Sequence, residues 1–201
     1  MPPVESGLDV LVRRRRGLLR GQRVAVVAHQ ASIDSRYEHA VELLREIRGV
    51  KVRTLLAPEH GLWGAPQDHI WIDGTRDPVT RLPVWSLYGA RREPTDAMLR
   101  GIDTVVVDLQ DVGSRYYTFI WTMALVMRAC ARSGVHVVVL DRPNPLGGAM
   151  VEGNVADPTF ASFVGLYPLA IRHGLTIGEI ARYLNERHGI GCRLTVVPMR
   201  G

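Results

Sequence analysis

The sequence predicts an α/β fold of Rossmann-like type, in which a doubly wound, mostly parallel sheet has helices on both faces. Two observations lead to this prediction. Short β-branched runs alternate along the chain with longer segments of helical periodicity, and the runs 103–109 and 135–140 are almost continuously apolar. Strands without polar alternation are typical of parallel sheets that are covered on both sides by helices. The length of 201 residues suits one domain of ordinary to large size.

The first half of the chain is expected to supply three strands and three helices. In order, we expect a helix over 8–19 closed by Gly21, a strand over 23–28, a helix over 37–47, a strand over 50–57, an irregular Gly/Pro-punctuated stretch over 58–81, a strand over 84–87 and a helix over 95–100. The helix over 37–47 rests on apolar residues at helical spacing. Thr95 is a plausible N-cap because its hydroxyl can accept a hydrogen bond from the first turn.

The second half continues the same alternation. We expect a strand over 103–109, a long helix over 117–133, a strand over 135–140, a loop over 142–148, a helix over 176–187 and a last strand over 193–197. Thr176 with Glu179 three residues later forms a capping box, which marks the start of its helix.

The composition argues against nucleic-acid binding and membrane insertion. The net charge is +5, but the one basic run, 13–16, has no interleaved aromatic residues that could stack on bases. No apolar run approaches the ~20 residues of a membrane span. No apolar stretch follows the basic run as in a secretory signal, so we expect a cytoplasmic protein if Met1 is the natural start. Cys130 and Cys192 are most simply small buried hydrophobic residues.

Several motifs of cofactor-dependent enzymes are absent from the sequence. Ala28-His29-Gln30-Ala31-Ser32 follows the first strand where a dinucleotide-binding protein would have G-x-G-x-x-G. There is also no Walker A sequence, no G-x-S-x-G elbow and no H-E-x-x-H metal spacing. We therefore expect no cofactor and no metal. One alternative stays open, since Asp108 and Asp111 could share a Mg²⁺ ion and support phosphoryl transfer.

Polar residues gather where three of the expected strands end. In doubly wound sheets, ligands bind outside the carboxyl ends of the strands, at the point where the winding reverses. The candidates there are Glu59, His60, Asp108, Gln110, Asp111, Arg115, Tyr116, Asp141, Arg142, Asn144 and, a few residues later, Glu152.

Structural roles are open alternatives for several of these residues. Asp108 could cap a neighbouring helix or pair with an arginine, and Asp141 with Arg142 could form an internal ion pair. Glu59 is the hardest to explain structurally. Burial of a carboxyl group raises its pKa, and a raised pKa is what a general acid needs near neutral pH.

Six blocks in the right order give the sequence a resemblance to the NamZ-type exo-β-N-acetylmuramidases. The blocks are Pro58-Glu59-His60-Gly61, 82–89 (LPVWSLYG), 108–118 (DLQDVGSRYYT), 140–148 (LDRPNPLGG), Val151-Glu152-Gly153 and 163–168 (FVGLYP). The resemblance implies a Rossmann-like N-terminal catalytic domain over residues 1–201, with the family's smaller C-terminal domain absent from this chain. It also implies hydrolysis of a terminal β-linked N-acetylmuramic acid without nucleotide or metal.

The resemblance further assigns roles to the candidates. It makes Glu59 the leading catalytic residue and Glu152 the second carboxylate. Our own hypothesis for the other candidates is that His60 and Arg115 orient or hold the lactyl carboxylate, and that Gln110, Asp111 and Asn144 bind sugar hydroxyls or the N-acetyl group. The expected partner is a muropeptide or a peptidoglycan-derived disaccharide. A non-catalytic muropeptide-binding domain is the main alternative.

Overall fold

Six parallel strands form the main sheet of the computed structural model, which describes residues 4–64 and 75–201. Their order across the sheet is β3 (Val84–Ser86), β2 (Lys51–Ala57), β1 (Arg23–Ala28), β4 (Thr104–Asp108), β5 (His136–Leu140) and β8 (Leu194–Val197). The chain runs outward from β1 to β3 and returns to β4, which pairs with β1 on its other side. This is the strand order of the Rossmann fold, and its winding reverses between β1 and β4.

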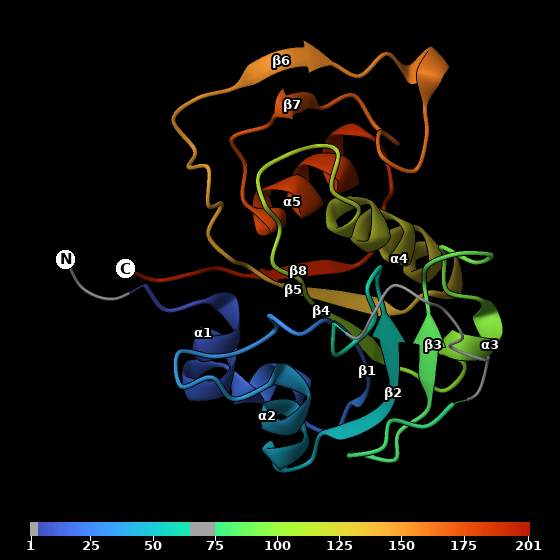
Figure 1. The fold of residues 1–201 in the computed structure, drawn as a ribbon. Helices are drawn as coiled ribbons and strands as arrows, with labels where there is room; N and C mark the ends of the chain where they lie inside the picture. The colour runs from blue at the N-terminus through green and yellow to red at the C-terminus, as the bar shows by residue number, and fades with distance from the viewer. Residues whose placement is uncertain (1–3, 65–74) are drawn as a thin grey trace.

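Helices cover both faces of this sheet, which confirms the predicted fold class (Figure 1). They are α1 (Gly7–Arg14), α2 (Ala40–Glu46), α3 (Asp96–Leu99), α4 (Phe119–Ser133) and α5 (Ile177–Arg187). Alternate residues of each strand enter different cores, because successive side chains point to opposite faces. Val24 and Val26 join the core under α1 and α2, whereas Ala25 and Val27 join the core under α3, α4 and α5.

The helix ends follow local capping rules, with one departure from the prediction. Thr95 accepts from the Met98 amide, and the capping box at the start of α5 is present. The helix expected over 8–19 is interrupted, because α1 ends at Arg14 and a 3₁₀ turn, Arg16–Leu19, follows. This break brings Leu19 into the core, where it is fully buried.

A small second sheet was not predicted. It is an antiparallel pair, β6 (Glu152–Val155) and β7 (Ala170–Arg172), joined through a 3₁₀ turn (Pro158–Phe160). All four residues of β6 are exposed, so the burial pattern that identifies a strand is missing. The pair lies beyond α5, away from the main sheet (Figure 1).

Both cysteines are buried and unpaired, in agreement with the prediction. Burial raises the pKa of Cys130 to about 12 and that of Cys192 to about 11, so both thiols stay protonated at neutral pH. Within residues 4–64 and 75–201, none of the helices is long and apolar enough to cross a membrane.

Candidate active site

Glu59 lies two residues beyond the end of β2, and side chains from two neighbouring segments hold its carboxylate. The Thr118 hydroxyl donates to Oε2 of Glu59 over 2.7 Å. The phenol of Tyr88 is also hydrogen-bonded to Glu59, and this bond, with the negative charge of Glu59, raises the pKa of Tyr88. Thr118 follows β4 and Tyr88 follows β3, so three strand ends meet at Glu59. Glu59 itself is half-buried.

The local backbone explains how these groups meet. Thr118 occupies the N-cap position of α4 but makes no side-chain capping bond, so its hydroxyl is available to Glu59. Immediately after Glu59, His60 has a φ of 66° and Gly61 a φ of 74°, which turns the chain sharply. The left-handed region is unfavourable for a residue with a Cβ atom, and such backbone strain clusters at functional sites. The His60 side chain is exposed.

His29 stands at the reversal point of the winding, one residue beyond β1. Ala28 pairs with Asp108 across β1 and β4, so His29 directly follows this junction. Its Nε2 accepts a hydrogen bond of 3.0 Å from the Gln110 backbone amide, and its ring packs 4.6 Å from that of Phe119. Burial, and then the nearby charge of Arg142, lowers the pKa of His29 to about 4. His29 is therefore a neutral imidazole whose acceptor nitrogen is Nε2.

Sequence reasoning missed His29, Thr118 and Tyr88 as site residues. The sequence analysis considered His29 only as part of the segment 28–32, which lacks the dinucleotide-binding motif. A usable signal was present, because His29 is the first polar residue after the buried strand at which a doubly wound sheet reverses. Thr118 and Tyr88 are recognised only through the three-dimensional contact with Glu59.

Asp108 and Arg142 pair with each other inside the protein. Nε of Arg142 lies 2.6 Å from Oδ1 of Asp108, and Nη2 lies 2.8 Å from Oδ2. Nη2 also donates to the Ile33 carbonyl over 3.0 Å. Asp108 is fully buried and Arg142 is 7% exposed. Pairing with an arginine was one of the two structural roles open for Asp108, and these contacts account for both oxygens of its carboxylate.

Asp141, beside Arg142, holds the start of α5. It accepts from the Gly178 amide over 2.8 Å and from the Thr176 hydroxyl over 3.1 Å. A carboxylate at a helix N-terminus satisfies free amides and matches the positive end of the helix dipole. The open alternative of an ion pair between Asp141 and Arg142 is thus not what the structure shows, because the Arg142 guanidinium pairs with Asp108.

The remaining polar candidates of this edge are also bonded within the protein. The side-chain amide of Asn144 donates to the Leu175 carbonyl over 2.9 Å. The side-chain amide of Gln110 donates to the Pro143 carbonyl over 2.9 Å. Oδ2 of Asp111 accepts from the Gly113 amide and lies 3.1 Å from Nε2 of His173, while its Oδ1 is buried without a hydrogen-bond partner among the described residues.

Asp108 and Asp111 thus have separate partners within the protein, Arg142 for the first and Gly113 with His173 for the second. Among the residues that the structure describes, no group of three or more His, Cys, Asp or Glu side chains could hold a metal ion.

Arg115 fastens the small sheet to the domain. Its Nη1 donates to the carbonyls of Asn154 and Leu169 over 2.7 and 2.6 Å, and the residue is 6% exposed. Tyr116, which is 54% exposed, lies beside this guanidinium with its ring centre 5.5 Å from Cζ.

Glu152, the second predicted carboxylate, lies on β6 and pairs with Arg172 over 2.6 Å. Its side chain is 59% exposed. None of its described contacts leads to Glu59. The structure therefore brings Glu59 together with Thr118 and Tyr88, and pairs Glu152 with Arg172.

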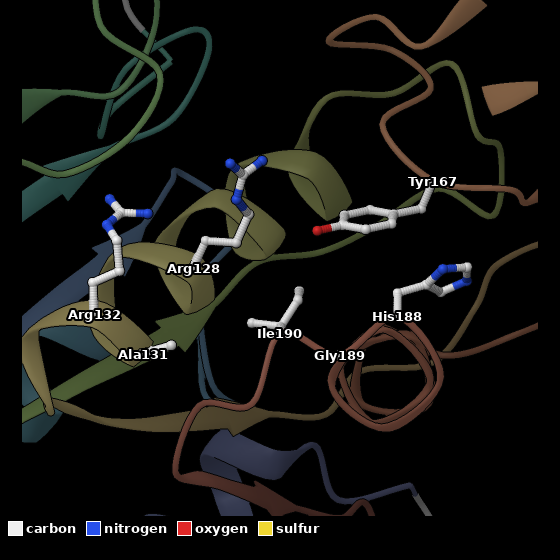
Figure 2. Close-up of a pocket in the computed structure, with 7 residues that line it drawn as sticks. All are labelled: Arg128, Ala131, Arg132, Tyr167, His188, Gly189 and Ile190. Carbon is white, nitrogen blue, oxygen red and sulfur yellow. The ribbon is translucent and has the colours of Figure 1, made fainter. Parts of the chain in front are cut away.

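A hollow of about 240 Å³ lies elsewhere, between the C-terminal half of α4, Tyr167 and the segment 188–190 that follows α5. Figure 2 shows Arg128 and Arg132 on α4, with Tyr167 across the hollow from them. Arg128 is ten residues further along α4 than Thr118, a distance of ~15 Å along a helix axis. Arg132 pairs with Glu93 over 2.8 Å. This hollow is therefore separate from the carboxyl edge of the sheet.

The comparison with protein families decides the relationship of the chain. A family model described as "Exo-beta-N-acetylmuramidase NamZ, N-terminal" matches residues 24–201. The chain belongs to this NamZ N-terminal family. The match includes every strand of the main sheet except the first residue of β1, and it includes Glu59, Tyr88 and Thr118.

Relatives of known sequence and structure agree with this membership. The chain is 41% identical over 199 residues to the peptidoglycan beta-N-acetylmuramidase NamZ of Bacillus subtilis (strain 168), covering 99% of this chain and 48% of that protein. Among solved structures, a DUF1343 family protein of Bacteroides fragilis NCTC 9343 has a TM-score of 0.92 at 38% identity, over 98% of this chain and 50% of that one. Another DUF1343 family protein of the same organism has a TM-score of 0.84 at 30% identity, over 99% and 52%.

The chain spans about half the length of the curated NamZ relative and of both solved structures. Within that half, the agreement extends over nearly the whole chain, which confirms the resemblance seen in the sequence blocks.

Proposed function

We propose that this chain is the N-terminal catalytic part of an exo-acting glycoside hydrolase that releases N-acetylmuramic acid from the non-reducing ends of peptidoglycan fragments. The substrate would be a muropeptide or a peptidoglycan-derived disaccharide. The observation that carries the proposal is the Glu59 carboxylate, held by Thr118 and Tyr88 at the carboxyl edge of a doubly wound sheet. The muramidase name of a relative that is 41% identical supports the substrate class.

Glu59 would act as the general acid that protonates the glycosidic oxygen of the leaving group. Its two holding groups suit this role because each is a hydroxyl. A hydroxyl donates to a carboxylate and accepts from a carboxylic acid, so Thr118 and Tyr88 can keep their contacts in both protonation states. Glu59 then keeps one orientation while its proton leaves and returns.

The base or nucleophile opposite Glu59 distinguishes the possible stereochemical courses. Two carboxylates ~5 Å apart support retention, and a separation of ~6.5–9.5 Å supports inversion. A 2-acetamido sugar can also supply its own nucleophile. Glu152, the second carboxylate that the resemblance implies, is held in an exposed ion pair with Arg172.

The deciding experiment measures release of a chromogenic group from its β-N-acetylmuramide, with the matching β-N-acetylglucosaminide as the control substrate. It is run on the 201-residue chain and on the longest natural form of the protein that contains it. Glu59→Gln is expected to abolish turnover without changing thermal unfolding. Glu46→Gln, an exposed glutamate of α2, is the matched control and should keep full activity. A Glu59→Gln variant with a near-normal rate would remove Glu59 from the mechanism.

Binding without turnover would point to the main alternative. If the wild-type protein binds N-acetylmuramic acid in both forms and hydrolyses nothing, it is a non-catalytic muropeptide-binding domain.

A further inference from the structure

Two of the sequence blocks meet beside Glu59, and the second of them has not yet been given a role. Tyr88 belongs to the block 82–89, and Phe163 belongs to the block 163–168, which lies between β6 and β7. The two rings are 6.3 Å apart between centres. Because the phenol of Tyr88 is bonded to Glu59, this aromatic pair borders the candidate catalytic carboxylate.

A positive charge is fixed on the same pair. Cζ of Arg92 lies 4.4 Å from the centre of the Phe163 ring. Stacking on an aromatic face occupies the flat side of a guanidinium and leaves its in-plane N–H groups for hydrogen bonds. Arg92 is exposed and forms no ion pair with any carboxylate among the described residues.

The charge of Arg92 is felt at the site. The hydrogen bond to Glu59 is the largest influence on Tyr88 and raises its pKa, whereas the charge of Arg92 acts on the same phenol in the opposite direction. Glu59 and Arg92 are thus both within electrostatic reach of one hydroxyl group.

Arg115, one of the two residues expected to hold the substrate's carboxylate, is already bonded within the protein. Nη1 of Arg115 already donates to two backbone carbonyls and the side chain is buried. An arginine whose donors serve backbone acceptors has fewer left for a ligand. Arg92 differs from Arg115, since it is exposed and stacked on a ring.

We propose that Arg92, stacked on Phe163 next to the pair formed by Tyr88 and Glu59, binds the carboxylate of an anionic sugar and so selects it over its neutral counterpart. The inference rests on the proposed function, in which the anionic sugar is N-acetylmuramic acid and the neutral counterpart is N-acetylglucosamine. Arg92 acts in recognition, and the proton transfer belongs to Glu59.

The geometry also indicates how the two functions are coupled. Planar guanidinium groups bind a carboxylate through two parallel hydrogen bonds, which fix orientation as well as position. A sugar held by its carboxylate at Arg92 can rotate little about the contact. Its glycosidic oxygen would then be presented to Glu59 in one orientation.

The test compares binding of N-acetylmuramic acid and of N-acetylglucosamine by titration calorimetry, in the 201-residue chain and its longest natural form. Arg92→Gln is expected to weaken N-acetylmuramic acid binding by about 10- to 100-fold, the usual effect of losing a charge-assisted hydrogen bond, and to change N-acetylglucosamine binding less than about twofold. Arg92→Lys should recover only part of the loss, because an ammonium group cannot form the paired bonds.

Two further measurements separate recognition from general damage. Phe163→Leu keeps Arg92 but removes its ring, and should weaken only the anionic sugar, by several-fold. Arg128→Gln, the exposed arginine of the hollow in Figure 2, is the matched control and should leave both sugars unaffected. Raising the salt concentration should weaken N-acetylmuramic acid binding in the wild type and hardly at all in Arg92→Gln.

The outcomes distinguish this inference from the proposed function. A wild type that prefers N-acetylmuramic acid, with an Arg92→Gln variant that keeps the preference, overturns the role of Arg92 and leaves the proposed function standing. Equal weakening of both sugars likewise overturns it. A wild type that binds neither sugar removes both proposals. Loss of turnover in Glu59→Gln, with turnover retained in Arg92→Gln, supports the proposed function on its own.

Discussion

Replacing Arg142 with methionine provides the sharpest test of how the carboxyl edge of the sheet is built. The substitution keeps much of the side-chain volume but removes the charge that pairs with Asp108. Asp108 is fully buried, and its two oxygens lie 2.6 and 2.8 Å from nitrogens of Arg142. Without Arg142 the carboxylate stays in the interior without a counter-charge, and the Ile33 carbonyl loses a donor.

The expected cost follows from this burial. Removing one partner of a buried ion pair destabilises a protein by about 3–5 kcal/mol, because the remaining charge is uncompensated. For a chain of 201 residues, each kcal/mol lowers the melting temperature by roughly 2–4 °C. We therefore expect Arg142→Met to melt roughly 6–20 °C below the wild type. The double variant Asp108→Asn/Arg142→Met should recover much of this loss, since neither charge remains in the interior.

The assay is unfolding by urea and by heat at pH 7, with the two single variants and the double variant forming a double-mutant cycle. A coupling energy near zero, or a loss below about 1 kcal/mol in Arg142→Met at an unchanged urea dependence, would refute the reasoning. Sugar binding adds an independent criterion. If Asp108 and Arg142 bind substrate as the sequence suggested, Arg142→Met would keep its stability and lose affinity for the sugar.

The remaining predictions concern protonation, packing and the orientation of the catalytic group. His29 has a pKa of about 4 in the folded protein, against about 6.5 in the unfolded chain. Between these pH values the unfolded chain binds a proton that the folded protein does not. The free energy of unfolding should therefore fall by up to ~3 kcal/mol as the pH drops from 6.5 to 4. His29→Asn should flatten this part of the pH–stability curve in urea unfolding, and an unchanged slope would contradict the assignment. A Cβ atom on Gly178 would lie 2.7 Å from the carboxylate carbon of the aspartate that caps α5. Gly178→Ala should therefore lower the free energy of unfolding by about 1–3 kcal/mol. A Cβ atom on Gly17 would have no atom within 4 Å, so the control Gly17→Ala should unfold like the wild type. Thr118→Val should lower kcat for muramide hydrolysis and leave KM unchanged, because Glu59 loses one of its two hydroxyl partners. Thr118→Ser keeps the hydroxyl and should keep the rate. Equal rates in the wild type, Thr118→Val and Thr118→Ser would exclude a role of Thr118 in orienting Glu59.

The main sheet could be predicted from the sequence because its strands are defined by local burial. All five residues of β4 and all five of β5 are buried, so each strand appears in the sequence as an apolar run. The capping box of α5 is equally local, since it needs only Thr176 and Glu179 at the right spacing. From these elements the strand order and the reversal point follow by the general rules of parallel sheets.

The small sheet could not be predicted because nothing local specifies it. β6 contains Gly153 and Asn154, residues that are uncommon in strands, and it is exposed throughout. Its position depends on Arg115, which lies 39 residues before Asn154 in the chain and donates to its carbonyl. A strand held by one distant guanidinium leaves no periodic pattern in its own residues.

The predicted site residues at the carboxyl edge differ in how they are bonded within the protein, and the reason lies in how an interior treats charge. Asp108, Arg142 and Asp141 were selected because they are ionisable groups at strand ends. At a buried edge, however, an ionisable group must find a partner or pay a large desolvation cost, so these residues are bonded within the protein. An uncharged hydroxyl can leave part of its hydrogen-bonding capacity unused at a smaller cost than a charged group. Thr118 and Tyr88 are therefore available to orient Glu59. A high density of charge at a strand end therefore indicates that the edge is closed by ion pairs and caps. The residues that hold a reacting group are better sought among uncharged donors that forgo a local bond, as Thr118 does at the N-cap of α4.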